Sequence, residues 1–157
     1  MSRFYWTVGV MERLLYNDGE TPLHMVIDTN SWAVLRITSR LLQHSCDVNI
    51  VDNTGRNAFL VLAYCIAQYV ANERCKPPVI DKFCDLFKEI LKNKSDPACK
   101  DTRGNTVLHV FGHSLKTAFY KTYLYLIPQL LQLGGDILLH NNESQSFYTM
   151  FKEYSAG

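Results

Sequence analysis

Three stretches of the chain place apolar residues three and four positions apart, which is the pattern of a helix with one buried face. These stretches cover residues 33–44, 80–93 and 115–133. A polar turn segment and a shorter apolar run precede each of them, and the apolar runs begin near residues 22, 58 and 107. The pattern therefore predicts an all-α chain in which helices come in pairs joined by polar turns.

A polar turn motif recurs ahead of each helix pair. It reads Gly-Glu-Thr-Pro-Leu-His from Gly19 and Gly-Asn-Thr-Val-Leu-His from Gly104, with weaker copies from Gly55 and from Asn141. The threonine hydroxyl can cap the first helix, and glycine favours the positive φ of a tight turn. A second motif, two aliphatic residues followed shortly by aspartate, closes each pair. The two motifs alternate in the same order, which predicts internal repeats.

The Thr-x-Leu-His sequence after a turn glycine resembles the ankyrin repeat, and the resemblance covers roughly residues 11–154. It implies an all-α ankyrin-repeat solenoid, in which each unit is a hairpin turn followed by two antiparallel helices. We expect one domain over residues 1–157, with about three full units and partial units at both ends. The expected units are residues 1–16 (partial), 17–51, 52–100, 101–140 and 141–157 (partial).

Two features depart from a regular repeat. In the second unit Asn57-Ala58-Phe59-Leu60 replaces Thr-Pro-Leu-His, so the usual hydrogen bonding between threonine and histidine is in doubt there. The same unit carries an insertion at residues 68–79, in which Pro77-Pro78 should end one helix and place a loop before a helix that starts around Val79. In the third unit Pro128 should kink or restart the helix.

The apolar faces define an expected core. Buried side chains are expected at Trp32, Leu35, Leu41, Leu42, Phe59, Leu62, Phe83, Leu86, Phe87, Ile90, Leu91, Leu108, Leu126, Leu130 and Leu131. In the aromatic run from Phe119 to Tyr125, the three tyrosines Tyr120, Tyr123 and Tyr125 cannot all face inward at helical spacing. One or two of them should be exposed or covered by a partner.

The resemblance also implies a function, because known ankyrin proteins bind other proteins through hairpin tips and the concave face of their first helices. We therefore expect a non-catalytic protein–protein interaction module, such as a scaffold or adaptor. The candidate partner-binding residues are Asn53, Arg56, Arg103 and Asn105 at the hairpin tips and Met25, Tyr64 and His113 on the first helices. Tyr64 is the best single anchor, since aromatic residues are enriched at interface hot spots.

The other residues of these two regions have simpler interpretations. Asp52 and Asp101 are expected to bond the backbone of their own turns, whereas Arg56 and Arg103 have no turn role. The same helical register that selects Tyr64 also places Val61, Cys65, Val110 and Ser114 on the first-helix face.

Two narrower resemblances stay open as alternatives. Units lengthened between their helices are similar to the C-terminal repeats of Fem-type ankyrin proteins, which act as substrate receptors of cullin-type ubiquitin ligases. Short viral ankyrin proteins, which inhibit host signalling proteins, form another group with irregular repeats. Either resemblance implies a protein partner.

Composition restricts the other classes of partner. The 16 basic and 15 acidic side chains give a formal charge of +1 with no basic block, so no nucleic-acid partner is expected. No apolar run approaches the roughly 18 residues that span a bilayer, so no membrane partner is expected. The 5 cysteines are widely and irregularly spaced, which favours free thiols in a reducing compartment, the cytoplasm or the nucleus.

Catalytic and metal chemistry find little support in the sequence. His109 and His113 lie four positions apart on an expected helix, but no acidic or cysteine ligand lies at a fitting interval. Cys65 with a histidine base would be a candidate nucleophile, yet no local signature surrounds it. We therefore expect no metal, no cofactor and no enzymatic activity, in a chain that is a monomer or part of a larger chain or complex.

Overall fold

The computed structural model describes residues 18–28, 33–44, 46–71, 77–116 and 120–157. Within these ranges the regular structure consists of helices, without a strand, which confirms the predicted all-α class. The helices are α2 (Pro22–Asp28), α3 (Ala33–Gln43), α4 (Ala58–Ala71), α5 (Pro77–Lys92), α6 (Val107–His113), α7 (Tyr120–Gln132) and α8 (Phe147–Ala156).

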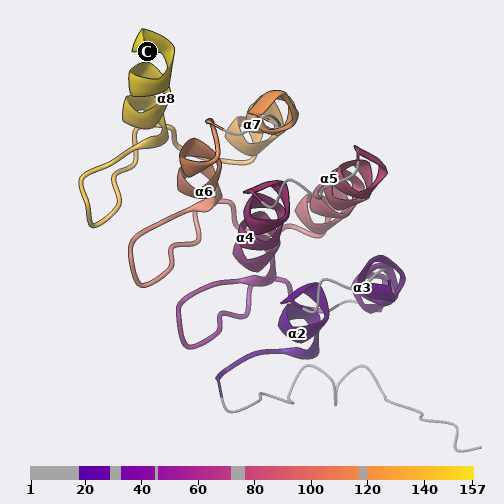
Figure 1. Cartoon of the computed structure of the whole chain (residues 1–157). Coiled ribbons are helices and arrows are strands. Elements are labelled where there is room, and N and C mark those ends of the chain that lie inside the picture. Colours follow the sequence, from indigo (N-terminus) through magenta and orange to yellow (C-terminus); the bar gives the residue numbers. More distant parts are fainter. Residues whose placement is uncertain (1–17, 29–32, 45, 72–76, 117–119) are drawn as a thin grey trace, which may run out of the picture.

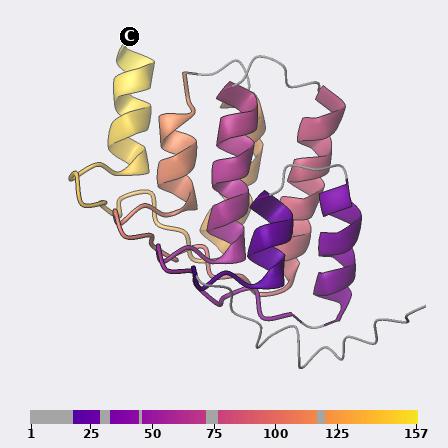
Figure 2. The same ribbon diagram turned by 60° about the horizontal axis from the view of Figure 1, so that its bottom comes forward.

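The helices form two layers of a stack (Figure 1). The first layer contains α2, α4, α6 and α8 side by side, and the second contains α3, α5 and α7. Figure 2 shows the connecting loops that precede α4, α6 and α8 gathered along one end of the helices. The chain thus repeats a unit of one turn, one first-layer helix and one second-layer helix.

The prolines predicted to interrupt helices occupy two different positions: Pro77 is the first residue of α5, and Pro128 lies inside α7. Helix α4 ends at Ala71 and α5 begins at Pro77, which confirms the interruption predicted before Pro77-Pro78. The start at Pro77 precedes the predicted one near Val79, because proline fits the first turn of a helix, where its missing N–H has no partner. Helix α7 continues to Gln132 with Pro128 inside it, so the helix is not restarted there.

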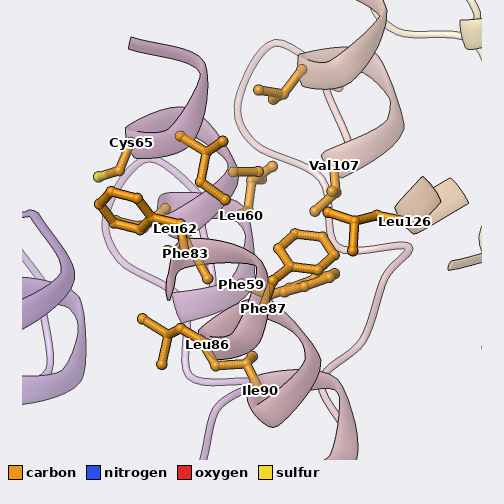
Figure 3. Close-up of a cluster of buried hydrophobic side chains, with 14 of the residues drawn as sticks. Phe59, Leu60, Leu62, Cys65, Phe83, Leu86, Phe87, Ile90, Val107 and Leu126 are labelled. Atoms are coloured by element: carbon orange, nitrogen blue, oxygen red, sulfur yellow. The ribbon is translucent and has the colours of Figure 1, made fainter. Parts of the chain in front are cut away.

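A chain of aromatic rings links consecutive units through the core. The ring centroids of Phe59 on α4 and Phe87 on α5 are 4.2 Å apart, and those of Phe87 and Phe111 on α6 are 5.5 Å apart. All three side chains are fully buried. Figure 3 shows Phe59 and Phe87 among the aliphatic side chains of both layers. Such tilted pairs add to the stabilisation that comes from burial alone.

The predicted core is confirmed at most positions, and the buried members are Leu41, Leu42, Phe59, Leu62, Phe83, Leu86, Phe87, Ile90, Leu91, Leu108, Leu126 and Leu130. The prediction that Leu131 is buried is wrong, because its side chain is 41% exposed. The equivalent positions on α3 and α5 are Leu42 and Leu91, and each of those helices is followed by another second-layer helix (Figure 1). Helix α7 is the last second-layer helix that the structure describes. Trp32 and the side chain of Leu35 lie outside the described residues.

Candidate functional site

Three hairpin turns, at residues 52–56, 101–105 and 141–145, share one scheme of hydrogen bonds. Their first residues are Asp52, Asp101 and Asn141, and each side-chain Oδ1 accepts from the backbone N–H groups two and four positions ahead at 2.8–3.0 Å. The backbone N–H of each first residue donates to the carbonyl four positions ahead at 2.9–3.0 Å. The expected backbone bonding of Asp52 and Asp101 is confirmed.

The hairpins are also bonded to one another, and we call the resulting surface the hairpin ribbon (residues 18–19, 52–56, 101–105 and 141–145). The N–H groups of Asn53, Thr102 and Asn142 donate to carbonyl oxygens of the preceding hairpin at 2.9–3.0 Å. Gly104 has a φ of +76°, and a Cβ on it would lie 2.8 Å from Oδ1 of Asn142. Close contact between successive hairpins therefore requires glycine at this position.

A buried histidine ties each of two first-layer helices to the next hairpin. Nε2 of His24 donates to the carbonyl of Arg56 at 2.8 Å, and Nε2 of His109 donates to the carbonyl of Gln145 at 3.0 Å. In each case Nδ1 accepts from the backbone N–H of the capping threonine, at 3.2 and 3.1 Å. Burial lowers the pKa of His109, although the Gln145 carbonyl acts in the opposite direction.

The second unit replaces this arrangement, as its sequence predicts. Leu60 stands where the other units have histidine, so it offers no ring nitrogen to the following hairpin. Asn57 takes the place of the capping threonine and is buried. Its Oδ1 accepts from the N–H of Leu60 at 2.9 Å, and its Nδ2 donates to the carbonyl of Asp96 at 3.2 Å. The asparagine therefore caps α4 and ties it to the end of its own unit.

Tyr64 supplies the connection that Leu60 lacks. Its hydroxyl donates to Oδ2 of Asp101 at 2.5 Å and accepts from Nδ2 of Asn105 at 3.4 Å. Oδ1 of Asn105 in turn accepts from Nδ2 of Asn141 at 2.8 Å. Burial, and then the hydrogen bond to Asp101, raise the pKa of Tyr64 to about 12. The candidate anchor Tyr64 is thus half-buried and holds the hairpin at residues 101–105.

Arg56 and Asn105 also have structural contacts that the sequence analysis did not predict. Nε and one terminal nitrogen of Arg56 each lie 2.9 Å from Oδ2 of Asp52, so the expectation that Arg56 has no turn role is wrong. Burial acts to raise the pKa of Asp52, but hydrogen bonds from the backbone of Arg56 and the hydroxyl of Thr54, with the charge of Arg56, hold it below its usual value. Asn105 is only 7% exposed.

The remaining tip candidates, Asn53 and Arg103, have exposed side chains. On the first-layer helices His113 is exposed and Met25 is half-buried. Val61, Cys65, Val110 and Ser114, which the register places on the same face, are all buried. Neighbouring first-layer helices pack side by side and cover these positions. The accessible candidates therefore gather at the hairpin tips and at the far end of α6.

The structure adds exposed residues that the sequence analysis did not select. Asn142 and Glu143 are exposed on the hairpin ribbon. The recurrence of the turn motif was the signal that could have found them, since equivalent tip positions share one environment. Tyr125 is 62% exposed, which confirms the expectation of an exposed tyrosine in the aromatic run. The side chains of Tyr120 and Tyr123 lie outside the described residues.

The part of the chain that the structure describes contains neither a cluster of metal ligands nor a membrane-spanning helix. In those ranges no group of three or more His, Cys, Asp or Glu side chains is placed to hold a metal ion. None of the helices described combines the length and the apolar character needed to cross a membrane.

Comparison with known families matches residues 18–53 to the ankyrin repeat. This segment begins at the first turn, contains α2 and α3, and ends in the following hairpin. Residues 18–53 therefore form an ankyrin repeat, and the two-layered, all-α stack of the described helices is consistent with an ankyrin solenoid. No curated protein matches the chain significantly. Ankyrin repeats are generally protein–protein interaction modules.

Proposed function

We propose that this chain is a non-catalytic module that binds a partner protein through the hairpin ribbon and the adjoining exposed residues of the first-layer helices. The observation that carries the proposal is the hydrogen bonding within and between the hairpins of the ribbon. Each tip is fixed by its own Asp or Asn side chain and by a backbone hydrogen bond to the preceding tip. Because the backbone of each tip is already held in one conformation, binding a partner does not have to order the loops.

The candidate residues divide into two groups according to their role. Arg56, Tyr64 and Asn105 hold the ribbon in place through their hydrogen bonds and the ion pair to Asp52. The side chains of Asn53 and Arg103 are exposed on it, and His113 is exposed at the end of α6. In this proposal the second group contacts the partner. Arg103 is the central candidate, because arginine is enriched at interface hot spots.

The state of the cysteines supports a non-catalytic role and a reducing compartment, the cytoplasm or the nucleus. Cys84 and Cys99 are free thiols. Burial raises the pKa of Cys84 to about 11 and also raises the pKa of Cys99. Such thiols carry little thiolate at neutral pH, and the thiolate is the form that acts as a nucleophile.

Site-specific photo-crosslinking tests the proposal. A photoreactive phenylalanine is placed at Asn53 or at Arg103 on the ribbon, with Gln132 on α7 as an exposed control position. Each variant must melt as cooperatively as the unmodified chain. The proposal predicts that both ribbon positions crosslink to the same protein and that position 132 does not. Crosslinks to that protein from position 132 alone would contradict it.

The identity of the crosslinked protein also distinguishes between the two narrower functions, a ligase substrate receptor and an inhibitor of a signalling protein. Scaffold subunits of a cullin-type ligase, captured together with further proteins, would mark a substrate receptor. A single signalling protein whose activity falls on binding would mark an inhibitor.

A further inference from the structure

A groove of about 610 Å³ lies between the two parallel second-layer helices α3 and α5. It is formed away from the hairpin ribbon, since every lining residue belongs to one of these two helices. Helix α3 contributes Arg36, Ser39 and Arg40, and α5 contributes Lys82, Asp85 and Glu89 above the buried Leu86. The lining residues recur at helical spacing, so each helix presents one continuous face to the groove.

The charged residues of the α3 wall are both cationic. Helix α3 contains no acidic residue, so Arg36 and Arg40 have no opposite charge on their own helix. Both side chains are exposed, and within the described ranges neither guanidinium forms an ion pair. The groove therefore presents two guanidinium groups, four residues apart, that retain their capacity to bind carboxylates.

The α5 wall is mixed in charge, with Lys82 beside the carboxylates of Asp85 and Glu89. Glu89 is engaged by Ser39, whose hydroxyl donates to Oε2 of Glu89 at 2.9 Å and bridges the two helices. Asp85 is exposed and lies one turn before Glu89. No ion pair joins the arginines to either carboxylate among the described residues.

We propose that this groove binds an extended, acidic segment of a partner protein. Carboxylates of the segment accept hydrogen bonds from Arg36 and Arg40, for which the planar, forked guanidinium is suited. The carboxylate of Asp85 accepts from backbone N–H groups on the opposite side of the segment. The α5 wall spans about 10 Å along its axis, which matches about three residues of extended chain. This second surface does not depend on the hairpin ribbon, so either proposal can fail without the other.

The test titrates the ¹⁵N-labelled chain with the blocked tripeptide acetyl-Glu-Ala-Glu-amide and follows the Nε–H signals of the arginines by NMR. Acetyl-Gln-Ala-Gln-amide is the uncharged control peptide. The proposal predicts saturable shifts at Arg36 and Arg40 with the acidic peptide and smaller, unsaturated shifts with the control. Equal responses to the two peptides, or shifts confined to Arg56 and Arg103, would overturn it.

Two variants complete the experiment. In Arg36→Gln/Arg40→Gln, which changes two exposed side chains, binding of the acidic peptide should weaken by about tenfold. Lys92→Gln removes an exposed cation from α5 outside the groove and should leave the affinity unchanged. If both variants lost affinity to the same extent, the peptide would be attracted only by the net charge of the protein. That result would contradict specific binding in the groove. Thermal melting confirms that both variants are folded.

Discussion

The hydroxyl of Tyr64 on α4 donates a hydrogen bond of 2.5 Å to Asp101, which is the first residue of the next hairpin. The same carboxylate side chain organises its own turn through the backbone N–H groups of Arg103 and Asn105. Asp101 thus forms hydrogen bonds both within its own hairpin and with the preceding unit. Because Leu60 cannot form the histidine contact of the other units, this bond connects the second unit to the third.

Tyr64→Phe should lower the free energy of unfolding by about 1–2 kcal/mol, because it removes the hydroxyl and leaves part of the Asp101 carboxylate unpaired. Urea denaturation at pH 7 measures the change. Tyr125→Phe is the matched control, because that hydroxyl belongs to a largely exposed ring, and it should change stability by less than about 0.5 kcal/mol. Equal effects of the two substitutions would show that the bond to Asp101 contributes nothing to stability.

Acid should destabilise the fold through His109. Its pKa in the folded chain is lowered from the ordinary value of 6.5, so the unfolded chain binds the proton more readily. The contribution of neutral His109 to the stability of the fold is fully present above pH 6.5, and it is lost as the pH falls through the lower pKa of the folded state. Stability measured against pH should therefore decline on the acidic side of neutrality.

The matched pair for this experiment is His109→Leu and His113→Leu. His109→Leu should be less stable at pH 7, because it leaves the Gln145 carbonyl without its donor, and should lose part of the acid dependence. His113 is exposed, so its replacement should keep the dependence of the unmodified chain. A pH profile that is the same in both variants would exclude His109 as its source.

Thr38 on α3 is fully buried, and its hydroxyl has no hydrogen-bond partner. Thr38→Val replaces the hydroxyl by a methyl group of similar size, so it removes an unsatisfied polar atom without leaving a cavity. We expect the variant to be as stable as the unmodified chain or up to about 1 kcal/mol more stable. Thr38→Ala opens a small cavity and should be less stable than Thr38→Val. A clear loss of stability in Thr38→Val, measured by urea denaturation, would show that the hydroxyl is solvated or bonded.

Gly104→Ala should destabilise the chain by more than about 2 kcal/mol, because it combines a positive φ with a steric clash. The added Cβ would meet Asn142 of the next hairpin at 2.8–3.0 Å. Gly134 also has a positive φ, of +99°, but a Cβ there would have nothing within 4 Å. Gly134→Ala therefore measures the backbone effect alone, and thermal unfolding of the two variants isolates the contact between hairpins. Equal losses would mean that the hairpins are not closely packed.

The helices and the turns were predictable because their signals are local. Apolar spacing located α3 and α5, and the repeated turn motif located even the fourth hairpin at Asn141, where Ser144 adopts the positive φ taken by glycine in the other copies. These signals depend on residues a few positions apart. A single sequence is sufficient to read them.

The roles of individual site residues were not predictable in the same way. Tyr64 and Asp101 are 37 positions apart in the chain, so nothing in the local sequence distinguishes a structural tyrosine from an exposed anchor. Arginine is not a common turn residue, so the sequence alone gives Arg56 no role in the turn. Its ion pair with Asp52 depends on the shape of the hairpin. Leu131 repeats the pattern of Leu42 and Leu91, and only the order of the stack explains why it is exposed.

Calorimetric titration of the crosslinked partner with the unmodified chain, Arg103→Glu and Lys92→Glu tests the central claim most directly. Both substitutions reverse one exposed positive charge, the first on the hairpin ribbon and the second at the end of α5. The account predicts that Arg103→Glu weakens binding by about tenfold or more while Lys92→Glu leaves it unchanged. Unchanged affinity for Arg103→Glu, with both variants folded, would contradict the assignment of the hairpin ribbon as the binding surface.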